Sequence, residues 1–195
     1  MSAAPQILDP RHPPARLALA YSTAADRPLW SSYFALEARL AETGRRTSQP
    51  MMTQLRLAWW RDRLSTPASD WPQGEPLLAA LTPWDRERGT LVALVDGWEA
   101  LLVGDDAGRA LAEARVCAML ALARLRGIDA APAIEAAARA CLAPEGAISA
   151  TPLPRSMRPL AVLRLLAVRD AARQDGATGP FGDAFALLRL ALIGR

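Results

Sequence analysis

The residues with the clearest chemical potential lie on two neighbouring predicted helices, residues 27–43 and 50–64. At about 100° per residue, Glu37 falls in the middle of the apolar arc of the first helix. On the second helix, Arg56 and Arg63 share a face with large apolar side chains. That face is formed by Met52, Leu55, Trp59 and Trp60. One carboxylate and two guanidinium groups are therefore expected in apolar surroundings.

Charged groups in such surroundings are costly unless they are paired. A short turn, residues 44–48, joins the two helices, so we expect them to pack antiparallel and Glu37 to be buried in an ion pair with Arg56, or with Arg63. Two interpretations of this cluster remain open. The favoured one is an ion-paired core that fixes the helix register, with Trp59 and Trp60 as core residues. The other is a degenerate pocket for a substrate, a metal ion or a prenyl chain.

The elements that position these residues are all predicted to be helices. Apolar residues recur at helical spacing along the chain, and nothing shows the alternation of a half-buried strand. Proline and glycine mark the helix boundaries. The predicted helices are 27–43, 50–64, 90–103, 106–126, 131–142, 156–174 and 183–193. The fold class expected is all-α, a single helical bundle.

Composition supports one folded domain and excludes some functions. The chain has 195 residues, of which 51% are hydrophobic and 22% charged, so we expect a flexible N-terminal segment, 1–14, and one domain, 15–195. A balance of 23 cations against 20 anions does not predict nucleic-acid binding. His12 is the only histidine and Cys117 and Cys141 the only cysteines, so no Cys/His metal site is expected.

The cysteines and the pattern of hydrophobicity favour a cytoplasmic protein. Both cysteines lie in alanine-rich helical stretches, where free thiols in a reducing compartment are expected. The best candidate for a membrane span is interrupted by Asp96 and Glu99, so we expect no transmembrane helix. Arginines near the end of the chain leave peripheral contact with anionic lipid open as an alternative to a solvated helix face; they are Arg155, Arg158, Arg164 and Arg169.

One segment resembles a known family. The run Gln-Pro-Met-Met-Thr-Gln-Leu-Arg-Leu-Ala-Trp-Trp-Arg-Asp-Arg-Leu, residues 49–64, follows Ala20-Tyr21 and the 31–42 helix. It resembles the squalene/phytoene synthase family, most closely the short bacterial members and the branch that contains a mitochondrial complex I assembly factor. Those proteins carry a comparable Glu-Pro … Arg-Leu-x-Trp-Trp-Arg segment. The resemblance covers the first third of the chain, and the rest only as a pattern of helices.

The resemblance implies a truncated isoprenoid synthase-like fold. Catalytic members of the family bind prenyl diphosphates through magnesium held by two Asp-x-x-x-Asp motifs, since carboxylates at i and i+4 share one helix face. Here the acids of the first motif would fall at or near Ala41 and Arg45. Glu42 is adjacent, but it projects about 140° away from Glu37. The first motif is therefore missing.

The second motif is also missing from the predicted helices. Asp105 and Asp106 follow Gly104 at a helix start, where such residues are typical caps. Asp170 and Asp175 are five residues apart, which does not place them on one face. No magnesium site and no other metal site is predicted, and no catalytic residue is assigned.

Three functional interpretations follow. The first is a non-catalytic member of the superfamily that acts as a binding or assembly factor for a protein complex, with a membrane-associated complex suggested by the assembly-factor branch; it needs no cofactor. The second is a prenyl-diphosphate-binding transferase, in which Arg45, Arg46 and Arg56 contact the diphosphate and magnesium is the cofactor. The third is a helical module with another partner. The sequence does not identify the partner or the oligomeric state.

Overall fold

The computed structural model describes residues 13–45, 50–104, 106–143 and 151–174 of the chain. Every regular element in these ranges is helical, so the all-α prediction is confirmed. The elements are α1 (Pro13–Ala20), α2 (Arg27–Arg45), α3 (Pro50–Ser65), η2 (Ala68–Asp70), α4 (Pro76–Leu81), η3 (Thr82–Glu87), α5 (Arg88–Val103), α6 (Arg109–Leu125), α7 (Ala131–Leu142), η4 (Arg155–Met157) and α8 (Arg158–Gln174). Within the described ranges, no helix has both the length and the apolar character needed to span a membrane.

The long helices begin and end close to their predicted boundaries, whereas two short helices were not predicted. Helix α1 begins at Pro13, inside the segment expected to be flexible, whose first twelve residues lie outside the described part. Helix α4 lies between the predicted helices 50–64 and 90–103, where the sequence predicted no helix. Pro76 occupies its first position, where proline is compatible with a helix, and the Glu75 side chain accepts from the Leu77 N–H. The predicted helix 183–193 lies outside the described residues.

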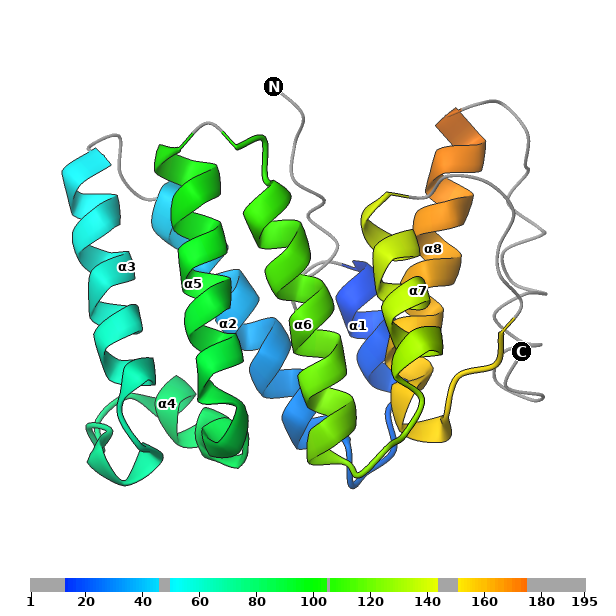
Figure 1. Ribbon diagram of the computed structural model, residues 1–195, viewed down its shortest axis with the longest axis horizontal. Helices are drawn as coiled ribbons and strands as arrows, with labels where there is room; N and C mark the ends of the chain where they lie inside the picture. Colours follow the sequence, from blue (N-terminus) through cyan, green and yellow to red (C-terminus); the bar gives the residue numbers. More distant parts are fainter. Residues whose placement is uncertain (1–12, 46–49, 105, 144–150, 175–195) are drawn as a thin grey trace.

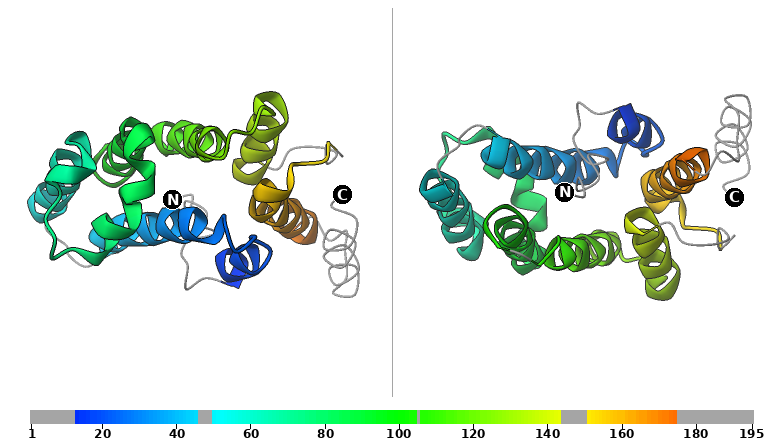
Figure 2. Two further views of the ribbon diagram at one scale, coloured as in Figure 1. Left: turned by 90° about the horizontal axis from the view of Figure 1, so that it is seen from below. Right: turned by 90° about the horizontal axis from the view of Figure 1, so that it is seen from above.

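The helices form two layers that meet at one end of the molecule (Figures 1 and 2). Helices α3, α5, α6 and α7 follow one another in one row, and α2 lies across from α5 and α6 on the other side of the core. Helix α8 packs against both α1 and α7 and so connects the layers. Helices α2 and α3 touch, but α3 packs mainly along α5. The predicted side-by-side packing of α2 and α3 is therefore a minor contact.

The core lies between α2 and the layer formed by α5 and α6. Trp30, Tyr33 and Phe34 of α2 are fully buried and pack ring against ring. Buried indole N–H groups have hydrogen-bond partners: Trp84 donates to Ser32 Oγ over 3.1 Å, and Trp30 donates to the Ser156 carbonyl over 3.0 Å. These bonds tie α2 to η3 and to η4, which are distant from it in sequence.

Candidate functional site

Glu37 is the most enclosed acidic residue of α2, with 1% of its surface exposed. Arg115 of α6 reaches it with two bonds, from Nη2 to Oε2 over 2.9 Å and from Nε to Oε1 over 3.1 Å. The Trp98 indole of α5 donates to Oε2 over 3.0 Å, and the Tyr33 hydroxyl donates to Oε1 over 3.3 Å. Each carboxylate oxygen thus accepts two hydrogen bonds. We call these four residues the Glu37 cluster.

The charges and hydrogen bonds of the Glu37 cluster are satisfied within the cluster itself. Burial works against the Arg115 cation, but the charge and hydrogen bonds of Glu37 outweigh it, so the pKa of Arg115 is raised. Burial, followed by the nearby Glu37 charge, raises the pKa of Tyr33 well above its ordinary value. The Arg115 guanidinium also lies 5.4 Å from the Trp98 ring centroid. The anion and the cation therefore balance each other beside a neutral phenol.

The expected burial of Glu37 is confirmed, but the expected partners, Arg56 and Arg63, are wrong. The correction comes from the orientation of the helices: α2 faces α6 across the core, and Glu37 points to Arg115. One sequence signal could have found this partner. Arg115 interrupts an apolar stripe of α6 at helical spacing, in which Leu111, Met119 and Leu122 are buried. An arginine in that stripe requires an acidic partner.

Helix α3 is rotated relative to its predicted face. Its buried residues are Thr53, Leu57, Trp60 and Leu64. Arg61, which is not on the predicted face, bonds Asp96 of α5 over 2.6 Å and also Glu99. This pairing and the buried stripe turn the other apolar residues outward. Met51, Met52, Leu55 and Trp59 are 77%, 38%, 62% and 40% exposed.

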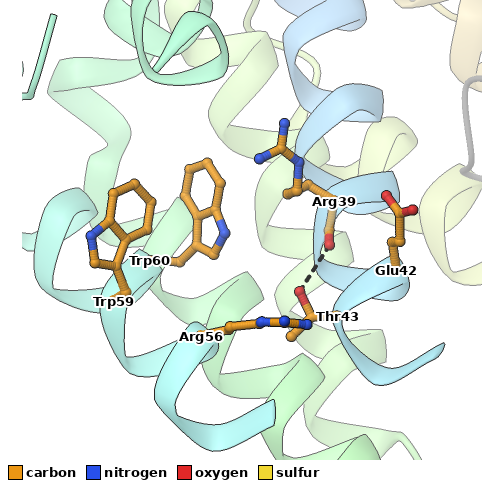
Figure 3. A pocket seen from close by; sticks show the side chains of 6 residues that line it. All are labelled: Arg39, Glu42, Thr43, Arg56, Trp59 and Trp60. Atoms are coloured by element: carbon orange, nitrogen blue, oxygen red, sulfur yellow. Dashed lines mark hydrogen bonds between the residues drawn. The ribbon is translucent and has the colours of Figure 1, made fainter. Parts of the chain in front are cut away.

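A hollow of about 300 Å³ lies between α2 and α3 (Figure 3). We call it the α2–α3 hollow; it is lined by Arg39, Glu42, Thr43, Arg56, Trp59 and Trp60. The Trp59 and Trp60 rings are nearly perpendicular, with centroids 5.0 Å apart. Arg39 places its guanidinium 5.8 Å from the Trp60 ring. Arg56 extends from α3 toward Thr43, whose hydroxyl donates to the Arg39 carbonyl over 3.0 Å.

The structure therefore divides the predicted site residues between two places. Arg56, Trp59 and Trp60 line the α2–α3 hollow, Glu37 lies in the core, and Arg63 lines neither. The second interpretation also named Arg45 and Arg46. The Arg45 side chain and the whole of Arg46 lie outside the described part of the chain. Two guanidinium groups beside aromatic rings can bind an anion that carries apolar groups.

Acidic residues outside the Glu37 cluster are spread along the chain. In the described ranges, no three His, Cys, Asp or Glu side chains come close enough together to hold a metal ion. The N-cap residue of α6 is Gly108, and Asp106 stands two residues before it; the Asp106 carboxylate accepts from the Gly108 N–H over 2.9 Å and from the Ala110 N–H of the first turn over 2.8 Å. The hydrogen bonds from these two amides lower the pKa of Asp106. Asp105 and Asp175 lie outside the described residues.

Comparison with protein-family models, with curated proteins and with solved structures finds no match to the chain.

Proposed function

We propose that this protein is a non-catalytic helical protein, similar to the squalene/phytoene synthase family, that acts as a binding or assembly factor for a membrane-associated complex. The observation that carries the proposal is the saturation of Glu37. Its two oxygens accept four hydrogen bonds from Arg115, Trp98 and Tyr33. The carboxylate on the inner face of α2 therefore has a structural role in the core.

This use of Glu37 bears on metal-dependent prenyl transfer. Such a reaction needs divalent ions to meet the negative charge that develops on the diphosphate. Each ion needs carboxylate oxygens with free lone pairs. For Glu37 to supply them, its pair with Arg115 would have to break and leave a buried cation without a partner. Where the acids of the first Asp-x-x-x-Asp motif of the catalytic family members would fall on this helix, the chain has Ala41 and Arg45.

The outward face of α3 supports a binding role. A helix that leaves Met51, Leu55 and Trp59 exposed beside a hollow with two arginines offers a surface for another molecule. A docking protein needs this kind of surface, and it needs no organised catalytic groups. Such a surface can bring the protein to a membrane, where its partner would be a protein or protein complex.

The alternative function is a prenyl-diphosphate-binding transferase, and the α2–α3 hollow favours it. Arg39 and Arg56 would contact the diphosphate, and Trp59 and Trp60 the prenyl chain. Guanidinium groups can hold a diphosphate, but they do not bridge it and activate the leaving group as a metal ion does. Ligand binding without turnover is compatible with this geometry.

The experiment that separates the two functions is an assay of pyrophosphate release. Purified full chain is incubated with farnesyl or geranylgeranyl diphosphate, with and without magnesium, beside a control without protein. We expect no magnesium-dependent release above that control. Release that Arg56→Gln abolishes and Arg86→Gln retains would establish the transferase instead. Arg86 is a matched control because it is an exposed arginine outside the α2–α3 hollow. It lies on η3, which leads into the first residue of α5.

A further inference from the structure

The large exposed apolar side chains of the described part of the chain gather at one end of the molecule. Met51, Met52, Leu55 and Trp59 occupy the first turns of α3, and Val103 is the last residue of α5. Helices α3 and α5 lie side by side and antiparallel, so the start of α3 and the end of α5 are neighbours (Figure 1). We call the four side chains on α3 the α3 apolar patch, and Val103 lies at the neighbouring end of α5.

Positive charge borders the α3 apolar patch. Arg56 is exposed on the same turns of α3 and has no ion pair or hydrogen bond with any residue in the described ranges. Arg39 is half exposed, and its contact with Glu75 is long at 3.5 Å. Two acids lie near: Glu42 lines the hollow from α2, and Asp62 is exposed one turn beyond Trp59. Arg56 is therefore available to an external anion, and Arg39 is held by Glu75 only over this longer distance.

We propose that the α3 apolar patch docks on the surface of a bilayer that contains anionic lipid. Met51, Met52, Leu55 and Trp59 enter the region between headgroups and acyl chains, and Arg56 and Arg39 contact lipid phosphates at the mouth of the α2–α3 hollow. This inference rests on the proposed function and names the surface that brings the protein to a membrane-associated complex.

The chemistry of the patch favours a bilayer over a protein. An indole ring beside arginine suits the headgroup region, where one side is apolar and the other wet. Arginine can extend its apolar stem along such a boundary and keep its charge among phosphates. Residues 52, 55 and 59 repeat at helical spacing, so α3 can lie in the plane of the interface.

Sedimentation with vesicles tests the proposal. Full-length protein is mixed with vesicles of phosphatidylcholine alone, or with vesicles in which about 30% of the lipid is phosphatidylglycerol, at low and at raised salt. We expect binding to the anionic vesicles, weakened by salt, and little binding to the neutral ones. Free inorganic phosphate should not compete, because the apolar patch contributes only at a bilayer. Equal binding to both vesicle types, or no binding to either, would overturn the proposal.

Two variants locate the contact. Leu55→Asp places a charge in the patch and should reduce vesicle binding at least about tenfold. Arg56→Gln should reduce it about fivefold and weaken the salt dependence, as expected for one basic residue at an anionic surface. Arg86→Gln, the matched control, should bind like the unmodified protein. All three residues are exposed, so their variants should fold, as circular dichroism would check.

The remaining outcomes are informative. If Leu55→Asp and Arg56→Gln both bind vesicles like the unmodified chain, the membrane surface lies elsewhere and the proposal is wrong. A different result is a protein that binds no vesicles and forms a dimer in light scattering, whereas the Leu55→Asp variant is a monomer. The patch would then be an interface between copies of the chain. Neither result would contradict the proposed non-catalytic function, which the assay of pyrophosphate release tests separately.

Discussion

At the scale of single residues, an ion pair between Glu87 and Arg124 links η3 to the end of α6. Arg124 donates from Nε and Nη2 to the two Glu87 oxygens, each over 2.7 Å, and the Glu87 side chain is 18% exposed. The hydrogen bonds from Arg124 lower the pKa of Glu87 below its ordinary value of 4.5. Because the pKa is lower in the folded state, the pair stabilises the fold above pH 4.5, and that stability is lost as the pH falls through the folded pKa.

This pair predicts a specific change in acid stability. Glu87→Gln should be less stable than the unmodified protein at neutral pH, and should lose less stability between neutral pH and about pH 3. Thermal unfolding midpoints across this range would measure the effect. Parallel curves for the two proteins would show that Glu87 titrates alike in the folded and unfolded chains, against the account.

The sequence predicted the environment of Glu37 but not its partner. A carboxylate in an apolar arc must be buried or paired, and the helical wheel of one segment is enough to show it. The choice of partner depends on which helix faces α2 across the core. Arg56 was close in sequence, whereas Arg115 is 78 residues away. A search for every charged residue within an apolar stripe would have included Arg115.

At the element scale, helix α3 shows where hydrophobic periodicity is ambiguous. Apolar residues occur on two sides of this helix, so two different faces satisfy the helical spacing. The choice between them is made by α5, which packs along α3 and binds Arg61 through Asp96, and Leu57 and Leu64 are on the buried face. The face predicted from the sequence is exposed at Met52, Leu55 and Trp59, so the expected core role is wrong for Trp59, and Trp60 is buried as expected. Its candidate pocket residues were still informative, because Arg56, Trp59 and Trp60 line one hollow.

Close contact between α5 and α6 gives a prediction for the element scale. A Cβ atom added to Gly97 would lie 2.7 Å from the Leu111 Cα atom, so the two helix backbones would have to separate. Gly97→Ala should lower the free energy of unfolding by about 1 to 3 kcal/mol. Gly89→Ala on the same helix is the control, because nothing lies within 4 Å of its added Cβ. The control should keep or gain stability through helix propensity.

Urea unfolding of the two glycine variants provides the measurement. Equal loss at Gly97 and Gly89 would attribute the effect to the alanine itself. No loss at Gly97 would show that the α5–α6 contact adjusts freely, contrary to the close packing described.

For the whole molecule, the positions of proline and glycine predicted the long helices and their order. Which helices pack against each other is determined by the folded chain. Proline and glycine define helix ends locally, so α2, α3, α5, α6, α7 and α8 could be predicted. Short α1 and α4 depend on tertiary contacts more than on local pattern. Their burial against α8 and α2 supplies that stability. Which helices are neighbours is a property of the folded chain that no single segment encodes.

The central claim is that Glu37 is a structural link across the core, and a double-mutant cycle tests it most directly. The free energies of unfolding in urea are compared for the unmodified chain, Glu37→Gln, Arg115→Met and the double variant. Each single change leaves a buried group without its partner, so each should cost about 3 kcal/mol or more. The double variant should lose less than the sum, with a coupling energy of about 2 kcal/mol.

Glu113→Gln serves as the matched control, because Glu113 pairs with Arg139 on the surface, where both side chains are about half exposed. It should change the stability little. The account predicts large losses at Glu37 and Arg115 that are strongly coupled. A Glu37→Gln variant as stable as the unmodified chain, with no coupling to Arg115, would contradict it and leave Glu37 available for chemistry.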